Sequence, residues 1–164
     1  MKKIHLIICS CFLLTAMTCT HESETEHHYI TMSNTSDYDI YVDRSFDYPD
    51  TSLKHSQNVM TPGWHLKVDS HSDDRDVFAC RSSYESWFNY IDKLIVFVFN
   101  ADTLERYGWE YAKDNNLVSQ RYDLSLDDLR QLNWRLTFPP TEEMSNIEMW
   151  PPYGTYDSMG HLIN

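Results

Sequence analysis

Six consecutive apolar residues, Leu94–Phe99 (LIVFVF), limit the folds open to this chain more than any other segment. A strand that faces water on one side alternates apolar and polar residues. An unbroken apolar run of this length is instead typical of a strand covered on both faces. We therefore predict a central strand at 94–99, with further layers of structure on both sides of its sheet.

Helical and strand patterns alternate after this run. A helix is predicted over 100–116, with Asp102 as its N-cap, and a strand over Leu117–Tyr122. Ser125 and Asp128 have the spacing of a capping box at the start of a short helix. This order of elements favours a sheet with helices packed against it.

The remaining strand patterns come mostly from the first part of the chain. Strands are predicted at 29–33, 38–43, 64–68 and 133–140, and a short helix after Ser82 or Ser83. Alternation places Trp64 and Trp134 on buried faces. The elements together predict an α+β fold, a mixed β-sheet with two or three short helices on one side. The alternative is an Ig-like β-sandwich with helical insertions.

The N-terminal region has the features of an export signal. Lys2 and Lys3 precede a mostly apolar stretch, Ile4–Met17, which is too short for a transmembrane helix and fits a signal peptide. Small residues lead directly to Cys19, and this arrangement resembles the bacterial lipoprotein signal, in which the cysteine carries a diacylglyceryl group. Cys11 is a rival site. We expect cleavage after residue 18 and acylation at Cys19.

We expect four segments along the chain. They are a signal peptide at 1–18, a flexible acidic and histidine-rich tether at 19–28, a globular α+β domain at 29–140, and an irregular acidic and aromatic, proline-rich tail at 141–164. The acidic tether resembles the signal with which Bacteroidetes export lipoproteins to the cell surface. The expected location is therefore the outer membrane, with the domain facing outward.

The cysteines leave a second interpretation open. If Cys19 is acylated, Cys80 is the one thiol that remains after cleavage, and no disulfide forms. If cleavage falls near Ala16 without acylation, Cys19 and Cys80 can pair in an oxidising compartment. The protein is then soluble in the periplasm, so the two interpretations exclude each other.

A formal net charge of −12 restricts the partners of the chain. Nucleic-acid binding needs a basic face, so we expect no nucleic-acid partner. The same charge opposes adhesion to anionic lipid beyond the anchor. Only four glycines are present, too few for a glycine-rich phosphate loop, and we expect no cofactor. The partners that remain are the membrane, through the anchor, and a glycan or protein at the cell surface.

Two kinds of chemical site are weak candidates. Closely spaced donors make a candidate metal loop of Asp69, His71, Asp73 and Asp74. Asp74 stands where a calcium loop needs glycine, and Cys80 where it needs glutamate, so we expect no metal site. A hydrolase would need two carboxylates across one cleft, such as Glu85 with Glu105 or Glu110. No G-x-S-x-G motif is present, and we expect no enzyme.

Aromatic residues give the most favourable functional signal. The chain holds five tryptophans and eleven tyrosines, and a sugar ring can stack on an exposed aromatic face. Most large aromatic side chains fill protein cores instead. Trp150, Tyr153 and Tyr156 lie in the proline-rich C-terminal segment and are the best candidates for exposure. We expect a binding or structural module at the outer membrane. The alternative is a surface protein that binds carbohydrate.

Three segments carry a resemblance to a family. They are YPDTSL, LIVFVFNADTLERYGWE and QRYDLSLDDLRQLNWRLTFPP. They resemble uncharacterised small lipoproteins of Bacteroides-type bacteria over most of the chain after the signal. This resemblance implies an envelope location and a domain type. It carries no catalytic or binding residue to this sequence.

Overall fold

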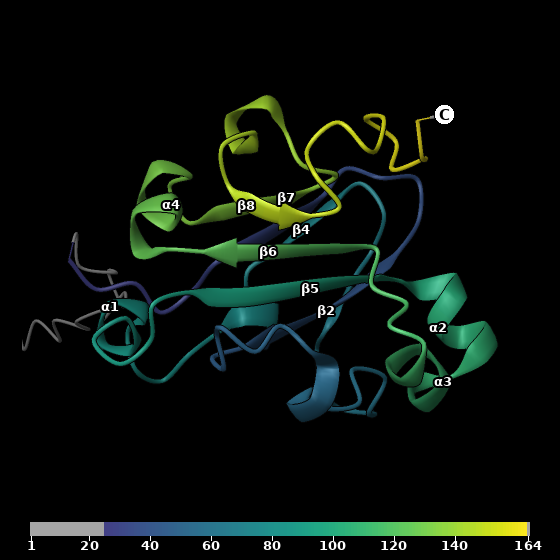
Figure 1. Ribbon diagram of the computed structural model, residues 1–164, viewed down its shortest axis with the longest axis horizontal. Helices are drawn as coiled ribbons and strands as arrows, with labels where there is room; N and C mark the ends of the chain where they lie inside the picture. The colour runs from purple at the N-terminus through teal and green to yellow at the C-terminus, as the bar shows by residue number, and fades with distance from the viewer. Residues whose placement is uncertain (1–24, 164) are drawn as a thin grey trace, which may run out of the picture.

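Strand β5 (Leu94–Asn100) lies at the centre of the fold, as the apolar run predicts (Figure 1). The computed structural model of the chain describes residues 25–163. Each side chain from Leu94 to Phe99 is at most 1 % exposed. Both faces of β5 are therefore covered, and the prediction of a buried central strand is confirmed.

β5 belongs to a five-stranded sheet in which every neighbouring pair is antiparallel. The strand order is β3 (Lys67–Val68), β2 (Ile40–Ser45), β5, β6 (Gln120–Leu124) and β8 (Glu148–Trp150). Val96 lies between Arg44 of β2 and Tyr122 of β6 in the register. Alternate residues of β5 therefore point to opposite faces of this sheet.

A second sheet of three strands covers one of these faces. Its order is β4 (Ser72–Asp74), β1 (Thr31–Asn34) and β7 (Arg135–Phe138). β1 pairs in parallel with β7 and antiparallel with β4, so the mixed pairing that the sequence predicts lies in this sheet. Met32 and Leu136 from it pack with Val42, Val96 and other residues of the large sheet in one buried cluster. The Ig-like alternative does not apply, because that sandwich is built from antiparallel sheets.

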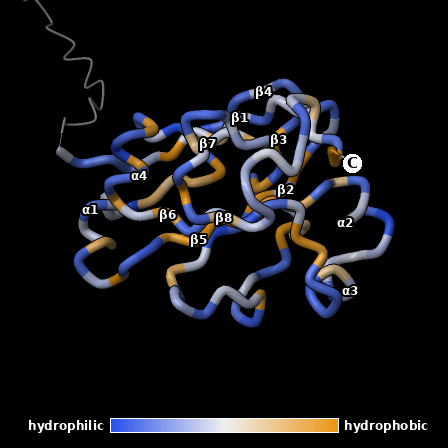
Figure 2. The backbone as a smooth tube through the Cα atoms, turned by 45° about the horizontal axis from the view of Figure 1, so that its top comes forward, coloured by the Kyte–Doolittle hydropathy of each residue, from blue (hydrophilic) through white to orange (hydrophobic). Residues whose placement is uncertain are grey.

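The other face of the large sheet is covered by helices and a long loop. Ile95, Phe97 and Phe99 pack there against α2 (Ala101–Tyr107), α3 (Trp109–Asp114) and the η1 turn (Leu53–His55). Figure 2 shows hydrophobic residues along the inner strands and hydrophilic ones along the outer loops. The fold is α+β, as predicted, with α2 and α3 on one side of the sheet.

Local capping explains where the short helices begin. Ser125 and Asp128 form the predicted capping box of α4 (Leu126–Gln131), and Ser83 caps α1 (Tyr84–Trp87). The predicted cap Asp102 is wrong, because Asn100 accepts the Thr103 N–H at 2.9 Å and starts α2 earlier. Two further single turns are η2 (Asp76–Phe78) and η3 (Glu142–Met144). No helix within residues 25–163 has the length and apolar character needed to cross a membrane.

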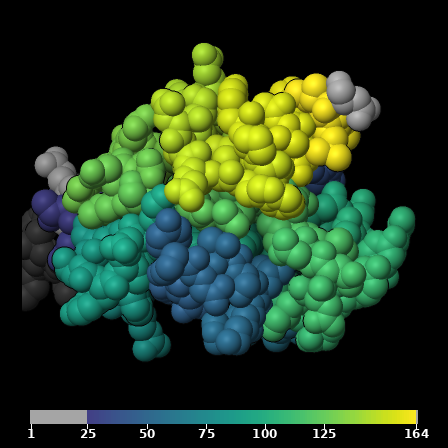
Figure 3. Space-filling view, viewed as in Figure 1, coloured from purple at the N-terminus to yellow at the C-terminus, as the bar shows by residue number. Residues whose placement is uncertain are grey.

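Both ends of the described chain are tied to the domain. The backbone carbonyls of His27 and His28 accept the N–H groups of Tyr84 and Cys80, each at 2.8 Å, so the tether predicted to reach residue 28 is wrong for these two residues. The prediction of an irregular tail is likewise wrong for Glu148–Trp150, which form β8. Figure 3 shows the C-terminal segment lying on the body of the domain.

Gly160 marks a close contact within this C-terminal segment. The Tyr38 hydroxyl donates to the Gly160 carbonyl at 2.9 Å. A Cβ atom at Gly160 would lie 2.7 Å from the Ser36 Cβ, whereas a Cβ at Gly63 would meet nothing within 4 Å. Both glycines have a similar positive φ, +86° and +88°. Their alanine variants therefore differ only in the steric contact.

We expect Gly160→Ala to lower the free energy of unfolding by about 1–3 kcal/mol more than Gly63→Ala, because overpacking adds to the cost of the positive φ. Urea denaturation of the two variants measures this difference. Equal losses of stability would show that the C-terminal segment does not pack on the turn before β2.

Candidate functional site

A cavity of about 410 Å³ lies at the open end of β2. β3 pairs only with Ile40 and Tyr41, so the outer edge of β2 has no neighbouring strand beyond Val42. The lining comes from four parts of the chain, namely residues 43–47, residues 55–57, Trp64 with Leu66, and Val77 with Phe78. Its volume lies within the range of small-molecule sites. We call it the β2-edge pocket.

Three aromatic side chains line the β2-edge pocket, namely Trp64, Phe46 and the buried Phe78. Trp64 is 48 % exposed, so its predicted place in the core is wrong. The strand begins only at Lys67, and the Trp64 N–H donates to the Thr61 carbonyl in a turn, so strand alternation does not orient this ring. The Phe46 ring stacks on the Trp87 ring, with the two ring centroids 4.7 Å apart and nearly parallel. The pocket therefore offers the exposed Trp64 ring to a ligand.

Two poorly satisfied polar side chains lie in the same pocket. Asp43 Oδ2 and Ser56 Oγ are buried without a hydrogen bond of good geometry to a described residue. Burial raises the pKa of the Asp43 carboxyl, although the Ser56 hydroxyl lies close enough to this carboxyl to lower its pKa in part. An unsatisfied buried polar atom costs stability, which a ligand hydroxyl can offset by supplying the hydrogen bond. Asp43 and Ser56 are therefore the lining groups whose hydrogen-bonding capacity is least satisfied within the protein.

The neighbouring Arg44 is held in place by the protein itself. Its Nη1 donates to the Tyr84 hydroxyl at 3.0 Å and its Nη2 to the Ala79 carbonyl at 3.1 Å. The Tyr84 hydroxyl in turn donates to the Phe78 carbonyl at 2.6 Å. These bonds fix one side of the pocket. Its geometry suits a ring that stacks on an aromatic face and hydrogen-bonds through hydroxyl groups.

The three aromatic residues predicted to contact a ligand, Trp150, Tyr153 and Tyr156, do not line the β2-edge pocket. Trp150 and Tyr153 are exposed, at 49 % and 43 %, on β8 and just after it. Tyr156 is half-buried, because its hydroxyl donates to the Ser119 carbonyl at 2.6 Å and its ring packs on Phe138. The exposure predicted for Tyr156 is therefore wrong. Trp134, predicted to be core, is half-buried against the inner core.

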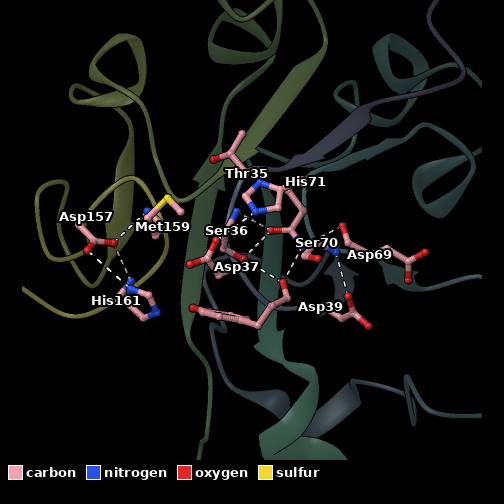
Figure 4. A network of polar contacts seen from close by, with 12 residues as sticks. Thr35, Ser36, Asp37, Asp39, Asp69, Ser70, His71, Asp157, Met159 and His161 are labelled. Atoms are coloured by element: carbon pink, nitrogen blue, oxygen red, sulfur yellow. Dashed lines mark hydrogen bonds and ion pairs between the residues drawn. The ribbon is translucent and has the colours of Figure 1, made fainter.

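Three of the four candidate metal side chains each contact a different partner. His71 pairs with Asp37 at 3.0 Å, whereas Asp73 pairs with Arg135 at 2.7 Å. A hydrogen bond from Ser33 and then the Arg135 charge lower the pKa of the Asp73 carboxyl. Figure 4 shows His71 turned toward Asp37 and Asp69 lying apart from that pair.

The carboxylate of the fourth candidate, Asp74, accepts a hydrogen bond from the backbone N–H of Asp76 at 2.7 Å and stabilises a local turn. Within residues 25–163, no three His, Cys, Asp or Glu side chains are grouped so as to hold a metal ion.

The carboxylates weighed for hydrolysis lie far apart. Glu85 is in α1 before β5, whereas Glu105 and Glu110 are in α2 and α3 after it, at the opposite end of the strand (Figure 1). A strand of the length of β5 spans about 20 Å. Glu85 therefore forms no cleft pair with Glu105 or Glu110. Cys80 is free and half-buried, and its predicted alternative partner Cys19 lies outside the described residues.

Asp43→Asn is expected to raise the free energy of unfolding by about 1 kcal/mol at neutral pH, because it removes a buried carboxylate that lacks a full set of partners. The folded-state pKa is raised above its ordinary value of 3.8, so ionisation opposes folding as pH rises. The stability difference between the parent protein and Asp43→Asn should thus shrink below that value.

Urea denaturation at several pH values measures the effect of Asp43→Asn. Asp47→Asn, at an exposed carboxylate of the same pocket, is the control and should change stability by less than about 0.5 kcal/mol. A loss of stability in Asp43→Asn would mean that Asp43 has a partner essential to the fold.

Comparisons of the chain with protein-family models, with curated proteins and with solved structures found no match. The site is therefore interpreted from its own geometry.

Proposed function

We propose that this chain is a lipid-anchored protein of the outer membrane whose domain binds carbohydrate in the β2-edge pocket. The observation that carries the proposal is the combination of an exposed Trp64 with the half-buried, poorly satisfied Asp43 carboxyl in one cavity. The lipoprotein-like segment that ends at Cys19 supports the location.

A sugar fits the chemistry of the β2-edge pocket better than a purely apolar ligand. The C–H face of a pyranose ring packs on an aromatic ring, and its hydroxyl groups act as both donors and acceptors. Asp43 supplies an acceptor, while His55 and Gln57 add polar groups at the rim. Trp64 is a rigid side chain that needs little ordering on binding. Specificity then comes from the buried polar atoms, since a ligand that leaves them unpaired binds weakly.

A protein partner is the second candidate, and one surface feature favours it. Tyr107 and Tyr111 are both about half exposed and stack with centroids 5.2 Å apart on α2 and α3. Tyrosine is enriched where proteins meet partners. This pair lies outside the β2-edge pocket, so the two candidate functions are separable by mutation.

We expect Trp64→Ala to weaken binding of the best ligand found on a glycan array by about tenfold or more, because it removes the stacking face. Trp150→Ala is the matched control, since Trp150 is equally exposed at 49 % but lies outside the β2-edge pocket. Titration calorimetry on the purified protein compares the two. Loss of binding in Trp150→Ala alone would move the site to the C-terminal segment, and binding to no glycan would refute the carbohydrate proposal.

The anchor is tested by the intact mass of the membrane-extracted protein. We expect a chain that begins at Cys19 and carries acyl chains, and we expect Cys19→Ser to abolish acylation while Cys11→Ser leaves it unchanged. An unacylated chain with no reactive thiol would instead indicate a disulfide between Cys19 and Cys80.

A further inference from the structure

A second cavity, of about 400 Å³, lies where the N-terminal strand meets the turn between α4 and β7. It shares no lining residue with the β2-edge pocket. Its lining includes two guanidinium groups, from Arg75 and Arg130, and no Asp or Glu side chain. In a chain of net charge −12, a cavity with two arginines and no carboxylate in its lining is an unusual local concentration of positive charge. We call it the arginine pocket.

Arg75 is held in position without having its charge neutralised. Its guanidinium lies over the Tyr29 ring at 4.0 Å, and it makes no ion pair with any described residue. Stacking orients the planar guanidinium and leaves its N–H donors free at the edge. Asp74 and Asp76 flank Arg75 in the sequence, but neither lines the arginine pocket. Arg75 is therefore an oriented donor without an anion.

Arg130 has a partner that it can release at small cost. It pairs with Asp127, one turn earlier on α4, at 3.1 Å, and the Asp127 side chain is 90 % exposed. Such exposed pairs contribute little to stability. Arg130 can therefore turn from Asp127 toward an anion in the arginine pocket, where the charge-assisted bonds are stronger.

The backbone beside these arginines has an uncommon conformation. α4 ends in a Schellman turn. In it the backbone N–H of Asn133 donates to the Arg130 carbonyl, and the backbone N–H of Trp134 donates to the Leu129 carbonyl. That turn requires a positive φ at Asn133, but Trp134 also has one, at 59°. A bulky residue rarely adopts this conformation, and such residues cluster at functional sites. The Asn133 side-chain amide is exposed and adds two donors to the arginine pocket.

His27 completes the lining beside the turn. Its ring stacks on Trp134 with centroids 4.1 Å apart, and its Nδ1 lies 2.6 Å from a Glu85 carboxylate oxygen. The His27 backbone N–H donates to the same carboxylate at 2.9 Å. Burial alone would raise the pKa of Glu85, but these hydrogen bonds from His27 lower it. Because Nδ1 is engaged by Glu85, the other ring nitrogen of His27 is the one that remains for a ligand.

We propose that the arginine pocket binds a phosphate group, gripped by Arg75 and Arg130 and bounded by His27 and Trp134. Guanidinium groups bind phosphate through paired N–H donors, and every polar side chain of the lining can donate. A carbohydrate in the β2-edge pocket is not needed for this site, because the two cavities have separate linings.

The test is a titration of the ¹⁵N-labelled full-length protein, in detergent, with inorganic phosphate at constant ionic strength. We expect saturable shifts of the Trp134 indole N–H with a Kd of about 1 mM, a modest affinity for a single anion. Arg75→Gln and Arg130→Gln should each weaken binding about fivefold or more. Arg106→Gln, at an exposed arginine of α2 that makes no ion pair with any described residue, and Trp64→Ala should not change it.

Two further probes identify the source of the phosphate. Glucose 6-phosphate tests a phosphorylated sugar, and phosphatidylglycerol micelles test a lipid headgroup. Tighter binding of either than of inorganic phosphate, when it is lost in Arg75→Gln and kept in Trp64→Ala, supports the site and names its ligand class. The proposal is overturned if sodium chloride reproduces the shifts, if none of the three probes binds, or if Arg75→Gln and Arg106→Gln have the same Kd. Thermal unfolding of each variant confirms that the fold is retained.

Discussion

Burial of β5 on both faces is the constraint on which the rest of the structure depends. Burying one large apolar side chain contributes about 1.5–3 kcal/mol, so a fully buried six-residue run outweighs any single helix cap in the fold. Each face needs its own cover. The three-stranded sheet covers one face, and α2, α3 and the η1 loop cover the other. The β2-edge pocket lies where this second cover ends beside β2, because β3 is only two residues long.

Much of the fold was predictable because local rules and tertiary packing agree. The apolar run predicts the buried strand β5, and the capping box at Ser125 predicts the start of α4. The predictions fail where two rules compete. Asn100 and Asp102 are both good N-caps, and only the end of β5 decides between them. β8 carries too short a pattern to be recognised without its partner β6.

The candidate pockets were not predictable, because neither is a motif. Asp43 reads as an ordinary polar position of an alternating strand, and its burial arises from the loop that contains Ser56. Trp64 fits strand alternation but precedes the strand. Arg75 lies in an acidic stretch whose carboxylates attract attention as metal ligands, yet Asp73 and Asp74 have partners within the fold. A net charge cannot reveal that two arginines share one cavity.

The contacts of His27 with α1 also set how an anchored domain would stand on a bilayer. The described part of the chain begins beside α1 and α4, at the end opposite α2 and α3 (Figure 1). Seven residues lie between Cys19 and His27, and the eight steps from one to the other span at most about 29 Å when fully extended. An acylated Cys19 would therefore hold this end of the domain, which carries the arginine pocket, close to the lipid. The tyrosine pair of α2 and α3 would then lie at the end away from the membrane.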